Sequence, residues 1–99
     1  TSIGDVALLA NRGVAAFAVV MHYPVRHILK YWQDDPTVEI RPGDAFIMND
    51  ARFGGIHNPD QSMVMPHFVD GELVSWTVCA MHEGEIGARA PGGMGPSIE

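Results

Sequence analysis

Apolar residues in the first third of the chain recur at a helical period. Four of them follow the i, i+3, i+4, i+7 spacing of one helix face: Val25, Ile28, Leu29 and Trp32. Pro24 precedes them, where a first helical turn tolerates proline, and an Asp-Asp-Pro stop signal follows. The pattern therefore predicts a helix from about residue 23 to residue 33. Residues 13–20, just upstream, fit either a helix or a strand.

Short apolar runs bounded by turn residues predict strands. Residues 5–10 are apolar and end at an Asn-Arg-Gly turn signal, so they are expected to form a strand. Residues 45–48 follow an Arg-Pro-Gly-Asp turn, and residues 37–40 precede it as a short extended piece. These two pieces are expected to be strands or near-strands around that turn.

The second half of the chain contains the clearest strand signal. Residues 62–68 and 73–81 flank an Asp-Gly pair, the strongest short hairpin signal. Both alternating sets of residues 73–81 are mostly apolar, as in strands covered on both faces. Cys79 lies in this run, so a buried and inert thiol is expected. Together these elements predict a mixed α/β or α+β fold with a mixed sheet, a β-hairpin and one helix.

The composition indicates that these residues are part of a larger protein. Hydrophobic residues make up 46% of the 99-residue chain and charged residues 18%, against about 25% charged in ordinary domains. So small a domain needs a polar outer surface, and the apolar excess indicates that more protein covers part of it. We therefore expect residues 1–99 to be a single segment of a larger subunit, which a chain beginning at Thr1 also favours.

Charge and hydropathy argue against two classes of partner. The net charge is −6 and the six Lys and Arg residues are spread singly, so no basic stripe can neutralise the phosphates of a nucleic acid. The longest strongly apolar run, residues 14–21, is far shorter than the roughly 20 residues that cross a membrane. One cysteine and no signal-peptide pattern are typical of a reducing cytoplasm, the expected location.

Residues able to bind a metal gather around the predicted hairpin. His57 and Asp60 flank an Asn-Pro pair, whose proline stiffens the loop and lowers the entropy cost of holding two ligands around one ion. If the residues flanking the Asp-Gly turn pair with each other, residue 59 faces residue 82, within a register slip of one or two. His82 then lies beside the loop as a third ligand. The alternative is an ordinary turn whose polar side chains bind their own backbone.

The ligand types indicate the metal and its neighbours. Two imidazoles and one carboxylate with open coordination positions form a common catalytic site for manganese, iron or zinc, and the absence of thiolate favours Mn²⁺ or Fe²⁺. Glu83 and Glu85 directly follow His82 and are candidate catalytic residues, either by orienting a ligating imidazole or as a general base. Four nearby glycines would let a substrate approach closely: Gly54, Gly55, Gly84 and Gly87.

Two aspartates upstream have other interpretations. Asp50 and Arg52 either bind an anionic substrate or only form a loop ion pair. In the first case Asp50 is a third candidate catalytic residue. Asp44 is expected to be a turn residue. No Gly-rich phosphate loop with a lysine occurs, so any nucleotide would bind to another segment or chain.

The remaining histidines are expected to be structural. His22 and His27 lie on or near the predicted helix and are interpreted as solvated or capping residues. His67, within an apolar strand, is expected to be packed and hydrogen-bonded, with Pro66 marking a bulge or a sheet edge.

Several of these residues belong to an ordered series of motifs. In chain order the series is Pro42-Gly43-Asp44, Asn49-Asp50, Gly54-Gly55, His57, Asp60, Asp70-Gly71-Glu72-Leu73, His82 and Pro91-Gly92-Gly93-Met94. It resembles the hydantoinase B / N-methylhydantoinase B family, which includes the α subunits of acetone carboxylase. The resemblance extends over nearly the whole chain.

The resemblance implies a function and partners. It implies that His57, Asp60 and His82 bind Mn²⁺ in the α subunit of an ATP-dependent ketone carboxylase, a ligase that forms a carbon–carbon bond between a ketone and a bicarbonate-derived carboxyl group. It also implies a hetero-oligomer with a β-type subunit that uses ATP and a small third subunit. The run from Met81 to Glu85 favours this branch of the family.

Two alternatives stay open at this point. The same site is compatible with an ATP-dependent hydantoinase or oxoprolinase that hydrolyses a cyclic amide. A non-catalytic module that packs against partner subunits is compatible with the apolar composition and the doubly apolar strand.

Overall fold

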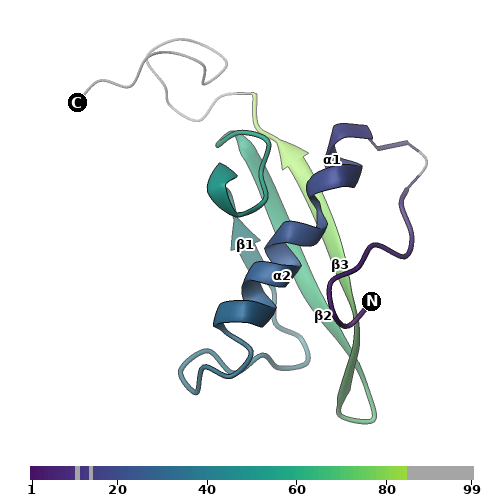
Figure 1. The fold of residues 1–99 in the computed structure, drawn as a ribbon, viewed down its shortest axis with the longest axis vertical. Coiled ribbons are helices and arrows are strands. Elements are labelled where there is room, and N and C mark those ends of the chain that lie inside the picture. The colour runs from purple at the N-terminus through teal and green to yellow at the C-terminus, as the bar shows by residue number, and fades with distance from the viewer. Residues whose placement is uncertain (11, 14, 85–99) are drawn as a thin grey trace.

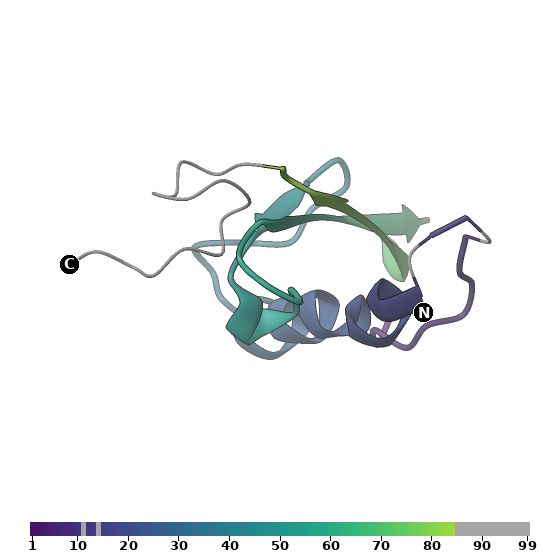
Figure 2. The same cartoon turned by 90° about the horizontal axis from the view of Figure 1, so that it is seen from above.

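The computed structural model describes residues 1–10, 12–13 and 15–84. Two short helices lie along one face of a three-stranded antiparallel sheet, which gives an α+β arrangement of two layers (Figure 1). Figure 2 shows the curved sheet on one side and the helices on the other. Of the two predicted fold classes, the structure has α+β.

The helices confirm the helical period of the sequence. Helix α1 spans Ala15–Val20, which decides the ambiguous region in favour of a helix, and helix α2 spans His22–Tyr31. Helix α2 agrees with the predicted residues 23–33 to within two residues. Pro24, Val25 and Ile28 are its buried residues, because the apolar stripe faces the sheet.

The hairpin is the central feature of the sheet and confirms the second-half prediction. Strand β1 spans Phe46–Met48, strand β2 spans Asp60–Val69 and strand β3 spans Glu72–His82, in the order β1-β2-β3. Asp70 and Gly71 both have positive φ, 49° and 85°, as a two-residue type I′ turn requires. The Asp-Gly pair therefore sets the turn that joins β2 to β3.

The register of the hairpin places a histidine opposite an aspartate. Val69 pairs with Glu72, as expected from the turn, but a bulge between His67 and Phe68 moves the later pairs by one position. Asp60, rather than residue 59, consequently faces His82. This shift lies within the one or two positions allowed for in the sequence prediction.

The predicted strand at residues 5–10 is wrong, since this segment has no regular secondary structure. Thr1 holds its beginning through hydrogen bonds with Asp5, and Arg26 forms an ion pair with Asp5 at 2.6 Å. Leu8 is 91% exposed. An apolar run becomes a strand only beside a hydrogen-bonding partner, and no ladder to this segment is present in the described residues.

The predicted extended piece at residues 37–40 is also wrong, because much of it lies in a turn. The Asp35 carboxylate accepts hydrogen bonds from the backbone N–H and the hydroxyl of Thr37, and the Asp35 carbonyl accepts from the N–H groups of Val38 and Glu39. Aspartate thus closes its own turn. The following turn agrees with prediction, because the Asp44 carboxylate accepts a hydrogen bond from the Arg41 N–H.

The two faces of the sheet differ sharply. Val64 packs with Val25 and Ile28 of α2 in a small core on the helix side. On the other side Ile47, Met63 and Met81 are 69%, 44% and 56% exposed. Strand β3 is therefore not covered on both faces by the described residues, and the expected burial of Cys79 is wrong, since its side chain is exposed. No helix of the described residues is long and apolar enough to cross a membrane.

Candidate metal centre

Three side chains predicted as metal ligands meet where β2 begins and β3 ends. His57 lies in the loop before β2, Asp60 is the first residue of β2, and His82 is the last residue of β3. One potential ligand atom from each lies within 4.8 Å of the other two. Residues 22 positions apart along the chain are brought together by the hairpin register, as Asp60 and His82 are direct partners.

Asp60 is the buried centre of the cluster. It is 1% exposed, and its Oδ2 accepts hydrogen bonds from the N–H groups of Ile56 and His57 at 3.1 and 3.2 Å. Burial raises the pKa of this carboxyl, but the hydrogen bond to His82, the backbone N–H donors and the His57 charge lower it by more, so the net direction is down. Asp60 is thus a carboxylate kept ionised in a buried place.

The two imidazoles approach Asp60 from different segments, His57 from the loop before β2 and His82 from the end of β3. His82 Nδ1 lies 2.9 Å from Asp60 Oδ1, and His57 Nδ1 lies 3.5 Å from Asp60 Oδ2. Their rings are 4.9 Å apart in an edge-on arrangement. The His57 and His82 side chains are 31% and 49% exposed, whereas the carboxylate is buried. The cluster is therefore closed to solvent at the carboxylate and open to solvent at the two imidazoles.

Backbone contacts hold the loop in this position. The Glu83 N–H donates to the Pro59 carbonyl at 2.9 Å, which extends the hairpin contact past the last paired residues. The Asp60 N–H donates to the His57 carbonyl at 3.0 Å, so the H-x-x-D segment is itself a tight turn. The Asn58 side chain accepts a hydrogen bond from the Ala51 N–H at 3.3 Å. The loop is tied both to β3 and to the segment upstream.

Gly54 allows the loop to pack closely against helix α2, rather than making room for a substrate. It has φ of +129°, and a Cβ there would lie 2.4 Å from Cδ of Pro24 on α2. Only glycine combines this backbone angle with this approach. The short 3₁₀ helix η1, Ala51–Phe53, precedes Gly54 and places the Phe53 ring 4.5 Å from the His27 ring. The loop therefore packs against α2 at residues upstream of the cluster.

The geometry and the donor set fit a divalent cation. Nitrogen and carboxylate ligands lie about 2.0–2.2 Å from an ion such as zinc, so two ligand atoms are at most about 4.4 Å apart. The observed limit of 4.8 Å needs a side-chain movement of a few tenths of an ångström. His57 Nδ1 is buried and has no hydrogen-bond partner among the described residues, which leaves a ring nitrogen available as a ligand.

Asp50 lies in a different setting. Arg52 Nε lies 3.0 and 3.1 Å from the two carboxylate oxygens, Arg52 Nη2 lies 2.6 Å from Oδ2, and the Arg52 N–H donates to Oδ1 at 2.9 Å. The side-chain hydrogen bond from Arg52 is the main cause of a pKa lowered to about 2. Asp50 also caps η1. A catalytic role for Asp50 stays a prediction.

The two predicted glutamates are only partly described. Glu83 follows His82 and is half-buried. Glu85 and Gly87, together with the Pro-Gly-Gly-Met motif at residues 91–94, lie outside the described residues. The catalytic roles assigned to Glu83 and Glu85 therefore stay predictions.

The other histidines lie away from the cluster. His67 Nε2 lies 2.6 Å from Thr77 Oγ1, so the predicted hydrogen bond is present, but the side chain is exposed rather than packed. His27 is partly buried against the rings of Tyr31, Trp32 and Phe53. That packing replaces the solvated or capping role expected of His27.

Ser62 was missed by the sequence reasoning. It is 1% exposed and lies two residues after Asp60, on the same face of β2. Strand alternation is the signal that relates it to Asp60, because residues i and i+2 share a face. Its hydroxyl has no hydrogen-bond partner in the described residues.

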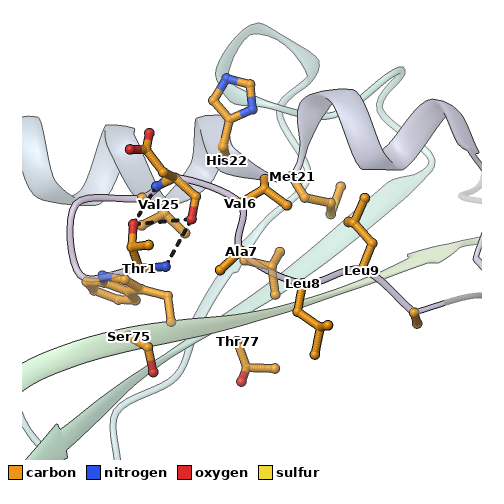
Figure 3. Close-up of a pocket in the computed structure, with 15 residues that line it drawn as sticks. Thr1, Val6, Ala7, Leu8, Leu9, Met21, His22, Val25, Ser75 and Thr77 are labelled. Atoms are coloured by element: carbon orange, nitrogen blue, oxygen red, sulfur yellow. Dashed lines mark hydrogen bonds between the residues drawn. The ribbon is translucent and has the colours of Figure 1, made fainter.

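A separate apolar hollow of about 390 Å³ lies between the N-terminal segment, the start of α2 and β3 (Figure 3). Leu8, Met21 and Thr77 are among the residues that line it. None of the three clustered side chains contributes to its wall. The candidate metal centre is therefore an open surface site and not part of this hollow.

Known proteins are similar to this chain in sequence and in fold. Residues 2–99 match the family Hydantoinase B/oxoprolinase. The chain is 42% identical over 94 residues to the acetophenone carboxylase delta subunit of Aromatoleum aromaticum, and 45% identical over 61 residues to caprolactamase subunit beta of Pseudomonas jessenii. These matches cover 95% and 62% of the chain. A nucleotide-free structure of acetone carboxylase superposes with a TM-score of 0.64 at 29% identity, over 73% of the chain.

The sequence and the α+β fold thus place this chain in a known class of proteins, which includes enzymes. The chain belongs to the Hydantoinase B/oxoprolinase family, which confirms the resemblance inferred from its motifs. It spans only 13% and 10% of the lengths of the two relatives and 9% of the acetone carboxylase chain.

Proposed function

We propose that this chain forms the metal-binding catalytic part of an α-type subunit in an ATP-dependent ketone carboxylase. The enzyme would act as a ligase, joining a bicarbonate-derived carboxyl group to an activated ketone. The observation that carries the proposal is the cluster of His57, Asp60 and His82, whose ligand atoms lie within 4.8 Å of one another. Similarity to an acetophenone carboxylase subunit over 95% of the chain supports this chemistry.

His57, Asp60 and His82 would hold the ion, with Mn²⁺ preferred over Fe²⁺ and Zn²⁺. A carboxylate with two imidazoles and no thiolate suits the harder ions. When bound, such an ion supplies a Lewis acid that stabilises negative charge on substrate oxygens. Because the two imidazoles are partly exposed, a bound ion would be accessible to a substrate. The buried Asp60 would contribute the negative charge that retains the cation.

The residues around the ligands have supporting roles in this proposal. The Ile56 and His57 N–H groups hold one carboxylate oxygen, which keeps Asp60 ionised and oriented. Glu83 follows His82 and is a candidate proton acceptor. ATP would be consumed by a β-type partner subunit, with a small third subunit in the same hetero-oligomer, because the chain has no lysine-bearing phosphate loop.

The test is metal content and turnover of the complete protein purified with its companion subunits. We expect about one Mn²⁺ per copy of this chain and ATP-dependent consumption of a ketone and bicarbonate. His57→Ala should lose both the ion and the carboxylation. Bound manganese and carboxylation that are unchanged in His57→Ala would rule out the proposed site.

A second candidate is ATP-dependent hydrolysis of a cyclic amide. Its support is the 45% identity to a caprolactamase subunit over residues that cover 62% of the chain. The same cluster would then polarise an amide carbonyl. Assaying the purified complex with a ketone plus bicarbonate and with lactams or hydantoins distinguishes the two reactions, because only one set would be consumed together with ATP.

A third candidate is a non-catalytic module that packs against other subunits. The exposed apolar sheet face, with Ile47, Met63 and Met81, favours such packing. A purified complex without a stoichiometric transition metal would support the module. So would an ion that is fully retained after His82→Ala.

A further inference from the structure

Ser62 is a buried polar residue that the proposed ligand set does not use. It is 1% exposed, and its Oγ has no hydrogen-bond partner in the described part of the chain. A buried hydroxyl without a partner disfavours folding, because it has lost its hydrogen bonds to water. An alanine would fill this place on β2 without that cost. The hydroxyl therefore calls for a role outside the fold itself.

The neighbours of Ser62 on the sheet leave one candidate partner. Ser62 pairs laterally with Met48 on β1 and Ala80 on β3, and paired residues point to the same face. Along β2, the nearest residues on this face are Asp60 and Val64. Only Asp60 among these four carries a polar side chain. Its Cα lies about 6.6–6.8 Å away, two strand residues along, within reach of a hydrogen bond made directly or through one water.

The Asp60 carboxylate loses an orienting contact when the site binds a cation through the facing nitrogen of His82. In this structure Oδ1 faces His82 Nδ1 at 2.9 Å, while Oδ2 is held by two backbone N–H groups. A ring nitrogen cannot donate a proton and coordinate an ion at the same time. Coordination through this nitrogen of His82 would free Oδ1 to bind the ion, and it would also remove the contact that now orients this oxygen.

We propose that Ser62 is a positioning residue of the metal site, whose hydroxyl donates to the Asp60 carboxylate, directly or through one water, and holds it in its ion-binding orientation. This inference rests on the proposed function. Residues that hydrogen-bond to a ligating carboxylate commonly change metal affinity by about 10- to 100-fold. Ser62 would act in this way from a buried position two residues after Asp60 on the same face of β2.

The test is equilibrium Mn²⁺ binding to the complete protein with Ser62→Ala, Ser62→Thr and Ser62→Val. Threonine and valine have nearly the same shape, but only threonine keeps the hydroxyl. We expect alanine and valine to weaken Mn²⁺ binding by about 10- to 100-fold, and threonine to stay within about threefold of wild type. The electron paramagnetic resonance spectrum of bound Mn²⁺ should change with alanine and not with threonine.

Thermal unfolding of the metal-free protein separates positioning from structure. Removing an unsatisfied buried hydroxyl should leave the Tm of Ser62→Ala unchanged or raise it, while Mn²⁺ binding weakens. A purely structural Ser62 would lower both together. If the larger side chains of threonine and valine prevent the metal-free protein from folding, the comparison of serine with alanine decides the question.

The outcomes distinguish this inference from the proposed function. Wild-type Mn²⁺ affinity in Ser62→Ala would overturn the role of Ser62 and leave the metal site intact. Equal losses in the threonine and valine variants would also overturn it. A wild-type protein that binds no Mn²⁺, or one whose Asp60→Asn variant binds it normally, would overturn both.

Discussion

Two aspartates ten residues apart, Asp50 and Asp60, lie in contrasting environments. Asp50 is partly exposed and is held by Arg52 at 2.6 Å, whereas Asp60 is buried and lies between two imidazoles. Both have a lowered pKa. Hydrogen bonds are the main cause of the lowered pKa in both: those at Asp50 come from Arg52, whereas those at Asp60 come from His82 and two backbone N–H groups and act against burial. The same direction of pKa shift therefore arises from different partners.

The difference shows which carboxylate is prepared to bind a cation. A guanidinium has no lone pair to offer an ion, so Arg52 can only compete with a metal for Asp50. An imidazole nitrogen can give up its hydrogen bond and become a ligand. Burial adds to this contrast, because an attraction between charges is stronger away from water. A substitution of Asp50 can therefore serve as the control for a substitution of Asp60 in the metal site.

The largest expected effect is that of Asp60→Asn. The asparagine oxygen can still accept from the Ile56 and His57 N–H groups, so the loop should keep its shape, but the negative charge is lost. We expect Mn²⁺ affinity to fall on the order of 1,000-fold, since a charged ligand is replaced by a neutral one. Isothermal titration and elemental analysis of the complete protein measure this.

Asp50→Asn is the matched control for that experiment. It removes the same charge from an exposed aspartate outside the cluster, and Mn²⁺ affinity should change by less than about threefold, as long-range charge effects are screened by salt. If Asp50→Asn lost as much manganese as Asp60→Asn, the contrast between the two aspartates would be wrong.

A smaller effect is expected from the histidines of the hairpin. His82→Ala should weaken Mn²⁺ binding on the order of 100-fold, because it removes one neutral ligand of three. His67→Ala is the control, since this histidine lies in the same hairpin and its side chain hydrogen-bonds to Thr77 Oγ1, away from the cluster. It should leave the metal content at the wild-type level. Full retention of manganese in His82→Ala would rule out His82 as a ligand and support the non-catalytic module.

The glycines allow a test of how the loop is positioned. Gly54 and Gly43 both have positive φ, +129° and +91°, but only Gly54 is crowded, since a Cβ added there would lie 2.4 Å from Pro24 Cδ. Gly43→Ala should cost about 1–2 kcal/mol of unfolding free energy from backbone strain. Gly54→Ala should cost about 1–3 kcal/mol more from overpacking.

Metal binding sharpens the comparison of these two glycines. Gly54→Ala should also weaken Mn²⁺ binding by about 10-fold, because a displaced loop moves His57 relative to His82. Gly43→Ala should leave the affinity unchanged. Denaturant unfolding and Mn²⁺ titration of both variants check this. Equal stability losses with no change in affinity would mean that Gly54 does not position the site.

The features that the sequence predicted have local causes. The Asp-Gly turn requires only the two residues with positive φ, and the H-x-x-D turn is closed by its own backbone hydrogen bond. The helix stripe of α2 is likewise a property of neighbouring residues. Because the hairpin joins two of these local features, the proximity of His57, Asp60 and His82 was accessible from the sequence.

The failures concern contacts between distant segments. Residues 5–10 are apolar enough for a strand, but strand formation depends on an available partner that a single sequence does not reveal. The bulge between His67 and Phe68 shifts the register by one; Pro66 indicates a bulge or a sheet edge in this part of β2, but periodicity alone does not give the position of the bulge. The sequence suggests that Gly54 makes room for a substrate, because its contact with Pro24 joins residues 30 positions apart and leaves no local signal.

The smallest expected effect concerns the Arg52–Asp50 pair. The pKa of Asp50 is lowered from 3.8 to about 2, mainly by the side-chain hydrogen bond from Arg52. A folded-state pKa below the unfolded value stabilises the protein above about pH 4, and this contribution disappears as the pH falls through 2. Arg52→Gln should return the Asp50 pKa toward 3.8, as followed by NMR of its carboxyl carbon.

Arg41→Gln is the control for this titration, because Arg41 pairs with Glu39 and not with Asp50. It should leave the Asp50 titration midpoint unchanged, and neither substitution should remove manganese. Because the Arg52–Asp50 pair is exposed, its effect on the Tm at neutral pH should be hard to detect. An Asp50 midpoint that stays near 2 in Arg52→Gln would show that backbone donors, as at Asp60, hold this carboxylate ionised, and the contrast between the two aspartates would then rest on burial alone.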